Sequence, residues 1–236
     1  MGQLEEMKIQ SPKWLSSFNA IRICVILSGL LLLSACSQSF TRQTCVSLPQ
    51  DSRYCLAPLL NQTHSMTQKI TIQVGTQQHE LMGQMDMSPN NLTLVGVAPL
   101  GQALFTLNYD GHTLHSEQSI LLGKQFRAEY LMAMLQLIYW PQSEVDHYLQ
   151  NAQLRTVNKA TRFCTSNKPF SQDKSTDCNK EMQCDAVLCK ALYNTQAGAT
   201  EVPILLIQYS QLSPWNASVT LSIPTAEFTL TLTPIT

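Results

Sequence analysis

Apolar and polar residues alternate along much of the stretch from Thr67 to Glu117, which is the pattern of β-strands that bury one face. Turn-forming residues interrupt this alternation at 75–78, 88–91 and 110–111, and Asp110-Gly111 is the strongest hairpin signal among them. Five short strands joined by such turns predict an antiparallel meander, curved enough to close partly. Three further strands are predicted near the C-terminus, at residues 204–209, 218–223 and 227–232.

The period changes between Phe126 and Tyr139, where apolar side chains recur at helical spacing and cover most of a helix surface. Trp140-Pro141 ends this helix, because proline disfavours helical backbone at the residue before it. Ser143 is expected to cap a second short helix over residues 144–149, whose first turn is acidic. Helices this apolar need a large concave apolar surface to lie against, and the predicted meander provides one.

The first 35 residues combine a basic start, an apolar run over residues 23–32 and small residues, which is the layout of a secretory signal. Leu33-Ser34-Ala35 is followed directly by Cys36, and this order resembles a bacterial lipobox. The resemblance implies that Cys36 is lipidated and becomes the first residue of the mature protein. Ser37 takes the next position, and resemblance to enterobacterial lipoproteins implies transfer to the outer membrane, with the folded part facing the periplasm.

Two other interpretations of this segment stay open, a non-lipidated signal cut near Ala35 and an uncleaved anchor. The apolar run is shorter than the roughly 20 residues that an ordinary membrane span needs. Both Met1 and Met7 are compatible with the start of the signal, and Met7 begins the more basic segment.

Charge and cysteine content agree with an exported protein. Only 13% of the residues are charged and the net charge is −1, so the basic field that nucleic acid requires is absent. Beyond the signal and Cys36, the chain has an even number of cysteines, which predicts up to three disulfides in an oxidising compartment. These residues are Cys45, Cys55, Cys164, Cys178, Cys184 and Cys189.

Cys45 and Cys55 are neighbours in sequence and are predicted to pair. The four cysteines between 164 and 189 are predicted to pair among themselves, in an order that the spacing does not decide. A zinc site is the alternative, but the sequence has no Cys-x-x-Cys pair and no histidine near the cluster. No metal and no other cofactor is expected.

The sequence divides into three parts: a signal peptide over residues 1–35, a lipidated tether over 36–65 and a domain over 66–236. The tether is rich in Ser, Thr, Gln and Asn. Within the domain, a strand that begins at 153–157 is interrupted by a cysteine-rich insertion at about 158–186. Disulfides there replace the burial that the polar insertion lacks.

The run Pro99-Leu100-Gly101 to Asp110-Gly111, with an apolar helix that ends at Tyr139-Trp140-Pro141, resembles a family of outer-membrane lipoproteins. It is a domain-of-unknown-function family whose genes often sit beside those for aryl-polyene biosynthesis. The family is similar to LolB, the outer-membrane receptor for lipoproteins, and to LolA, its periplasmic carrier. The resemblance covers residues 67–149 well and 204–233 loosely, and it leaves out the cysteine-rich insertion.

The resemblance implies a mainly β fold, an incomplete antiparallel β-barrel of the LolA/LolB kind with a helical lid over an apolar cavity for acyl chains. Methionine side chains are adaptable and suit such a cavity. The plain alternative is that the same residues fill a core. The candidate cavity residues are Met85, Met87, Leu94, Phe105, Leu107, Leu131, Met134, Leu135, Ile138 and Trp140.

Catalytic motifs are missing from the sequence, which has no nucleophile elbow, phosphate loop or His-Glu-x-x-His stretch. His112 and His115 flank one hairpin on opposite faces, so a shared metal is disfavoured. An unrecognised hydrolase is therefore the least favoured hypothesis.

Two non-enzymatic hypotheses rank above the hydrolase. The first is a lipoprotein held to the outer membrane by its N-terminal lipid, which takes a lipid or lipoprotein-like cargo, with a periplasmic carrier protein as the donor. The second is an assembly or scaffold lipoprotein that binds proteins through its disulfide-rich loop.

Overall fold

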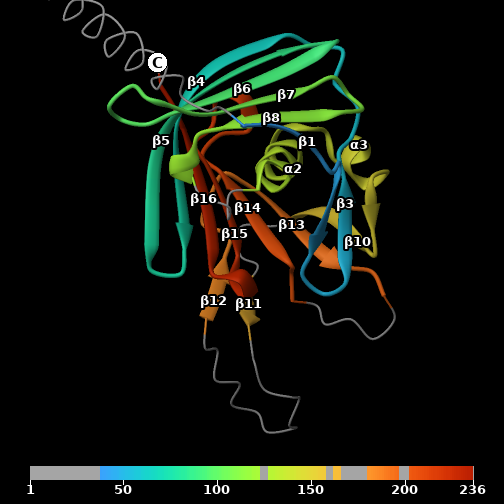
Figure 1. Cartoon of the computed structure of the whole chain (residues 1–236). Coiled ribbons are helices and arrows are strands. Elements are labelled where there is room, and N and C mark those ends of the chain that lie inside the picture. The colour runs from blue at the N-terminus through green and yellow to red at the C-terminus, as the bar shows by residue number, and fades with distance from the viewer. Residues whose placement is uncertain (1–37, 123–126, 158–161, 166–179, 197–201, 236) are drawn as a thin grey trace, which may run out of the picture. The chain divides into compact units, whose positions relative to one another are not determined.

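One antiparallel sheet of 11 strands dominates the computed structural model (Figure 1). The structure describes residues 38–122, 127–157, 162–165, 180–196 and 202–235. In sheet order the strands are β1 (Gln38–Arg42), β8 (Leu114–Gln118), β7 (Ala103–Tyr109), β6 (Asn91–Val97), β5 (Gln77–Ser88), β4 (His64–Val74), β16 (Phe228–Pro234), β15 (Val219–Ile223), β14 (Leu205–Tyr209), β13 (Leu188–Asn194) and β10 (Ala152–Val157).

Strands β4 to β8 follow one another in sequence and in space, which confirms the predicted meander. The three C-terminal strands are confirmed as β14, β15 and β16. Antiparallel pairing of β4 with β16, in which Ile70 lies opposite Leu232, joins the two groups into one sheet. Among the described residues β1 and β10 are the sheet edges and do not pair with each other, so the sheet is open.

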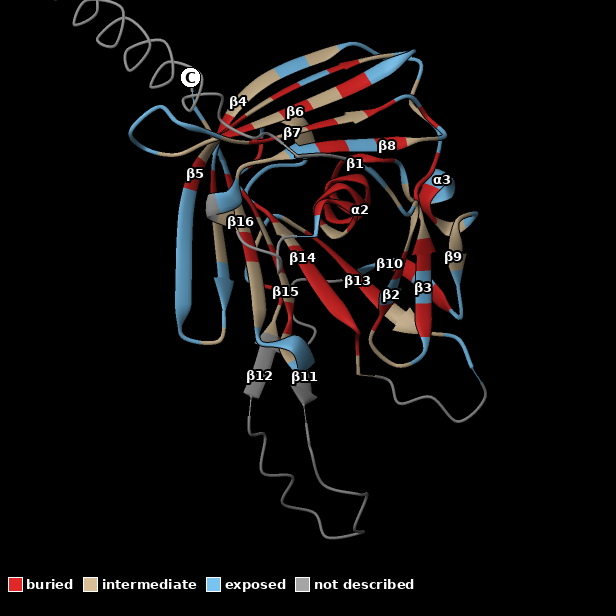
Figure 2. Ribbon diagram, in the orientation of Figure 1, coloured by how far each residue is buried: buried red, intermediate tan, exposed pale blue. Residues whose placement is uncertain are grey.

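Helix α2 (Ala128–Tyr139) lies in the space that the bent sheet partly surrounds (Figures 1 and 2). All of its residues except Tyr130 are buried, and Figure 2 shows the helix almost entirely in the colour of buried residues. A helix that is apolar on nearly every side is stable only when neighbours cover every side. The curved sheet provides that cover, and the resulting core runs continuously through sheet and helix.

The second helix differs from the prediction. Helix α3 spans Gln142–Asp146 rather than 144–149, and Ser143 lies inside it. The carbonyl of Pro141 accepts hydrogen bonds from the N–H groups of Glu144 and Val145, which starts the helix before Ser143 can cap it. Residues 149 and 150 instead form strand β9 (Leu149–Gln150).

Residues 38–55 also differ from the predicted tether. Strand β1 belongs to the main sheet, and β2 (Cys45–Leu48) and β3 (Ser52–Cys55) form a hairpin that pairs with β9. The partners of β1 and of the outer side of β3 are β8 and β9, which are remote in sequence, so this polar segment offered little local sign of a sheet. The folded domain therefore begins by residue 38 rather than at residue 66.

Two disulfides stabilise the described part of the chain. The predicted Cys45–Cys55 bond is confirmed and joins β2 to β3. Cys184 and Cys189 form the second bond, which agrees with pairing inside the C-terminal cluster. The prediction that Cys164 and Cys178 also form disulfides within the cluster concerns side chains outside the described residues. The insertion contributes β11 (Arg162–Thr165) and β12 (Lys180–Gln183), which form a separate two-stranded sheet.

Candidate functional site

All ten predicted cavity residues lie together in one buried cluster between the sheet and α2. Their exposed fractions range from 0% to 7%. Met85 on β5, Leu94 on β6 and Leu107 on β7 are direct neighbours across three strands, and α2 contributes the helical members. The structure therefore brings these residues together as predicted, whereas a ligand-binding role for them remains a prediction.

Two glycines let side chains lie flat against the inner face of the sheet. A Cβ atom on Gly96 would lie 2.3 Å from the ring of Phe105, which occupies that space. A Cβ atom on Gly83 would similarly lie 2.4 Å from the side chain of Ile70. The absence of a side chain at these two positions is what allows the large neighbouring groups to approach the backbone.

Helix α2 is attached to the segment after β3 by a buried glutamine. Gln136 is fully buried, and its Nε2 donates to the carbonyl of Ala57 at 2.9 Å. Its Oε1 accepts from the Ala57 N–H at 2.8 Å and from the Tyr54 hydroxyl at 2.9 Å. The indole Nε1 of Trp140 donates to the carbonyl of Pro58 at 2.9 Å. These bonds hold residues 56–58 against the end of α2.

A tyrosine of β7 contacts the same segment. The Tyr109 hydroxyl lies 2.9 Å from the Gly111 carbonyl oxygen and within 3.3 Å of the carbonyls of Leu56 and Ala57. The hydroxyl has a single proton, so it donates to one of these carbonyls at a time. Burial raises the pKa of Tyr54 and of Tyr109 above the ordinary tyrosine value. Both phenols therefore stay neutral and serve as hydrogen-bonding groups.

A second buried glutamine is only half satisfied. Gln68 on β4 is fully buried, and its Oε1 accepts a hydrogen bond from the Tyr139 hydroxyl at 3.0 Å. Its Nε2 has no hydrogen-bond partner. The residue directly opposite on β5 is Gly83, which has no side chain to offer. Gln68 therefore places a free amide donor inside the apolar core.

Three stacked rings lead outward from Gln68. Tyr139 stacks on Trp215 with ring centroids 4.5 Å apart, and Trp215 stacks on His64 at 3.8 Å. Trp215 belongs to η2 (Pro214–Asn216), the single turn between β14 and β15, and is half-buried. Burial lowers the pKa of His64, so the neutral imidazole is favoured in the stack.

A lysine also lies on the inner face of the sheet. Lys190 on β13 is 9% exposed, and its ammonium nitrogen is 5.5 Å from the ring centroid of Tyr209. Within the described residues its ammonium has no carboxylate within ion-pair distance. Burial lowers the pKa of this ammonium, and the ring face of Tyr209 offsets part of the desolvation.

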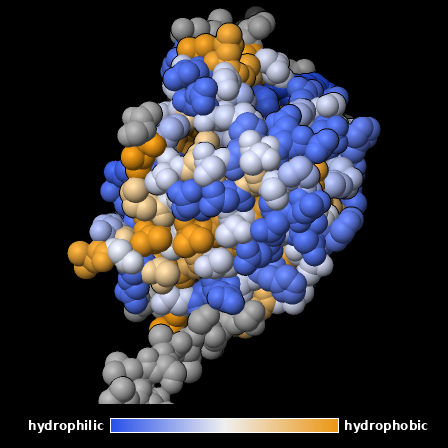
Figure 3. Space-filling view, turned by 90° about the horizontal axis from the view of Figure 1, so that it is seen from above, coloured by the Kyte–Doolittle hydropathy of each residue, from blue (hydrophilic) through white to orange (hydrophobic). Residues whose placement is uncertain are grey.

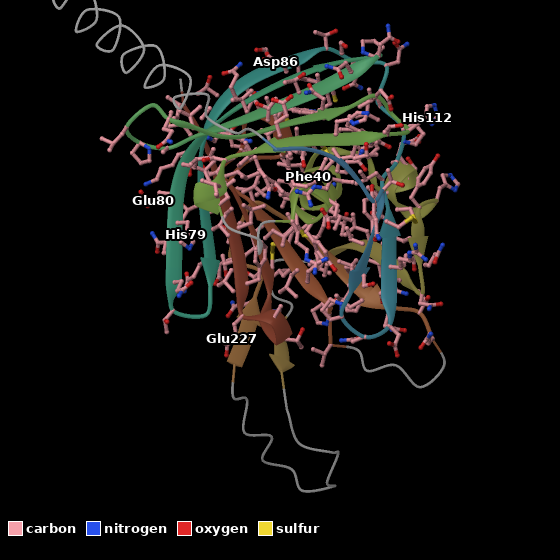
Figure 4. All side chains as sticks on the ribbon, in the orientation of Figure 1. Phe40, His79, Glu80, Asp86, His112 and Glu227 are labelled. Atoms are coloured by element: carbon pink, nitrogen blue, oxygen red, sulfur yellow. A yellow bond between two sulfur atoms is a disulfide. The ribbon has the colours of Figure 1, made fainter. Side chains whose placement is uncertain are left out.

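The described residues hold no cluster of three or more metal-binding side chains. The labelled residues His79, Glu80, Asp86 and His112 lie on the outside of the molecule; His79 and Glu80 are neighbours on β5, and Asp86 and His112 lie away from them (Figure 4). No helix among the described residues is long and apolar enough to cross a membrane.

The sequence reasoning missed Gln68, Gln136, His64 and Trp215. Gln68 could have been found, because the strand alternation puts it on the inner face between Met66 and Ile70. Gln136 is a lone amide on an otherwise apolar part of the helix. The sequence around Trp215 does not indicate its ring stacking, because its partners come from β4 and α2.

The fold and this interior define a mainly β domain in which an open antiparallel sheet bends around one buried helix. Residues 65–236 match a family described as "Protein of unknown function (DUF3261)", and the chain belongs to that family. No curated protein matches the chain significantly.

Proposed function

We propose that this protein is a non-enzymatic outer-membrane lipoprotein that binds the hydrocarbon chains of a lipid or lipoprotein-like cargo and helps its transfer or insertion at the outer membrane. In this proposal the open sheet is an incomplete barrel of the LolA/LolB kind, and α2 is its lid. The observation that carries the proposal is the buried α2 inside a bent sheet, with ten apolar residues of sheet and helix in one cluster.

The interior is closed in the conformation described, so a hydrocarbon chain must replace contacts between α2 and the sheet. Met85, Met87 and Met134 all lie in that contact region and are at most 2% exposed. Unbranched thioether side chains repack around different shapes more easily than branched ones. These three residues are therefore the part of the interior best suited to variable chains.

One end of the sheet carries exposed apolar side chains. Leu100, in the turn between β6 and β7, is 98% exposed, and Ile120, in η1 (Ile120–Leu122) after β8, is 84% exposed. The Ser119 N–H donates to the Leu104 carbonyl at 2.7 Å, which joins the end of β8 to the start of β7. Both side chains therefore belong to the same end of the sheet.

Strand β1 begins at this end, because Gln38 pairs with Gln118, and Cys36 lies two residues before Gln38 in the sequence. A lipid on Cys36 would hold this end at the bilayer surface, where Leu100 and Ile120 can enter the interface. Burying one such side chain contributes about 1.5–3 kcal/mol. Seen from above, hydrophobic residues gather on the side where Figure 1 draws β5, and the opposite side is hydrophilic (Figure 3).

Mass spectrometry of the full-length protein purified from its membrane tests the proposal. We expect co-purified acyl lipid that is released on unfolding and replaced by an added fluorescent fatty-acyl probe. A protein that folds, carries no lipid and takes up no acyl probe would overturn the proposal and favour the scaffold hypothesis.

The donor is proposed to be a periplasmic carrier protein. Cargo would move without an energy source from the carrier to this protein and then to the bilayer, because each step would take it to a site of higher affinity.

A further inference from the structure

We propose that Gln68 is a subsite for an acyl carbonyl: its side-chain N–H donates a hydrogen bond to the ester or amide carbonyl oxygen of the cargo. The inference rests on the proposed function and names the chemical group that the interior recognises. The hydrocarbon part of the cargo would then lie among the apolar residues of β5 to β7 and α2.

The starting observation is the contrast between the two buried glutamines. Gln136 uses both ends of its amide, with the Ala57 backbone and the Tyr54 hydroxyl as partners. Gln68 is equally buried, yet its Nε2 has no acceptor. Buried donors in native structures almost always have a partner, and a bound ligand is one way to supply it. An amide nitrogen has two N–H donors, so the unmet capacity at Gln68 is large.

The surroundings of Gln68 favour an uncharged acceptor. Its cross-strand neighbours are Gly83 on β5 and Pro234 on β16, and Tyr139 holds its Oε1. None of these three residues carries a charge. A carboxylate or phosphate buried here would lose its hydration without a cation from any of these three neighbours, which is strongly unfavourable. A carbonyl loses far less hydration, and one N–H group satisfies it.

Tyr139 fixes the direction of the free donor. Its hydroxyl donates to the Gln68 oxygen, so the nitrogen is turned away from that bond and is left for the cargo. Tyr139 is also the inner ring of the stack with Trp215 and His64, which extends from the core to half-buried positions. Tyr139 therefore connects the Gln68 subsite to the ring stack, whose outer members are the half-buried Trp215 of η2 and His64 of β4.

The test compares two probes of similar length on the full-length protein, methyl palmitate labelled with carbon-13 at its carbonyl, and heptadecane. In wild-type protein we expect the infrared carbonyl band of bound methyl palmitate to shift to lower frequency, as in a hydrogen bond. We expect Gln68→Met, which keeps the length of the side chain, to remove this shift. The variant should bind methyl palmitate about 5-fold more weakly, the effect of one neutral hydrogen bond, and heptadecane equally well.

Tyr139→Phe is the second variant, because it keeps the ring stack and removes only the hydroxyl that orients the amide. We expect a smaller band shift and unchanged heptadecane binding. An identical carbonyl band in wild type and Gln68→Met would overturn the carbonyl subsite. Binding of heptadecane in that case would still support the proposed function. Failure of both probes to bind the wild type would overturn the proposed function itself.

Discussion

The side-chain amide of Gln136 forms two hydrogen bonds with the backbone of Ala57, one to its N–H and one to its carbonyl, across 79 residues of sequence. This pair joins the buried helix to the segment that follows β3. Two more hydrogen bonds hold the same end of the helix, from the Tyr139 hydroxyl to Gln68 on β4 and from the Tyr209 hydroxyl on β14 to the carbonyl of Ile138. Movement of α2 away from the sheet therefore has a natural pivot at its C-terminal end.

Replacing each buried glutamine by leucine should lower stability by different amounts. Gln136→Leu leaves the Ala57 backbone and the Tyr54 hydroxyl unpaired and should lower the free energy of unfolding by about 3 kcal/mol. Gln68→Leu is the comparison variant: it removes a donor that has no partner, which offsets part of the cost of leaving the Tyr139 hydroxyl unpaired, so the loss should be smaller, about 1 kcal/mol. Urea unfolding measures both, and equal losses would contradict the distinction.

Gly96 and Phe105 should be energetically coupled. Gly96→Ala puts a methyl group into the space of the Phe105 ring and should destabilise the protein by about 1–3 kcal/mol. Phe105→Leu makes room, so the double variant should be more stable than the sum of the two single changes implies. A double-mutant cycle measures the coupling, and strict additivity would show that the ring yields without strain.

The Cys45–Cys55 disulfide should contribute stability through the hairpin that it closes. The bond spans 10 residues, and a loop of this size predicts a loss of about 2–3 kcal/mol in the Cys45→Ala/Cys55→Ala double variant. Thermal unfolding with and without a reductant checks the value. The reductant should have less effect on the double variant than on the wild type.

Alkaline pH should unfold the domain through its buried tyrosines. Burial raises the pKa of Tyr54, Tyr109, Tyr139 and Tyr209, so their neutral forms are favoured in the folded state. Their contribution is complete below the unfolded-state pKa of about 10 and is lost as the pH rises above it. Tyrosinate absorbance should therefore rise in two steps, the second together with unfolding. A single step before unfolding would contradict the burial.

The exposed side chains Leu100 and Ile120 should affect membranes without affecting the fold. Leu100→Asp/Ile120→Asp should leave the unfolding midpoint within error, because both side chains are almost fully exposed. It should reduce transfer of a fluorescent acyl lipid into phosphatidylethanolamine vesicles by about 10-fold or more, given the burial free energy of two apolar side chains. Leu212→Asp, which changes another exposed leucine at 73%, is the matched control and should transfer normally.

Local sequence patterns were sufficient for much of the fold. Strict alternation with strong turn residues determines β4 to β8, because each strand pairs with its neighbour in sequence. The apolar run of α2 was equally clear, although its first residue is Ala128. Strands β1 and β9 could not be predicted, because their partners β8 and β3 are about 75 to 100 residues away. Short polar strands carry little pattern of their own.

The candidate site was predictable only in its apolar part. Buried positions are mostly apolar, so the burial of Met85, Leu107 and Leu135 could be predicted from the hydrophobic periodicity. Hydrogen-bond partners and ring stacking depend on three-dimensional neighbours, and Gln68 and Trp215 acquire their significance only from Tyr139. A polar residue at an inward strand position was the one signal available in advance.

In the proposed function, occupation of the concavity by α2 would affect the kinetics of cargo exchange. Helix and hydrocarbon would compete for one surface, so the observed affinity for cargo would be the intrinsic affinity reduced by the small fraction of molecules that are open. Loading would follow the frequency of opening rather than the rate of collision. Repacking of the helix against the sheet would then favour release of the bound cargo, which suits a protein that transfers its cargo better than one that stores it.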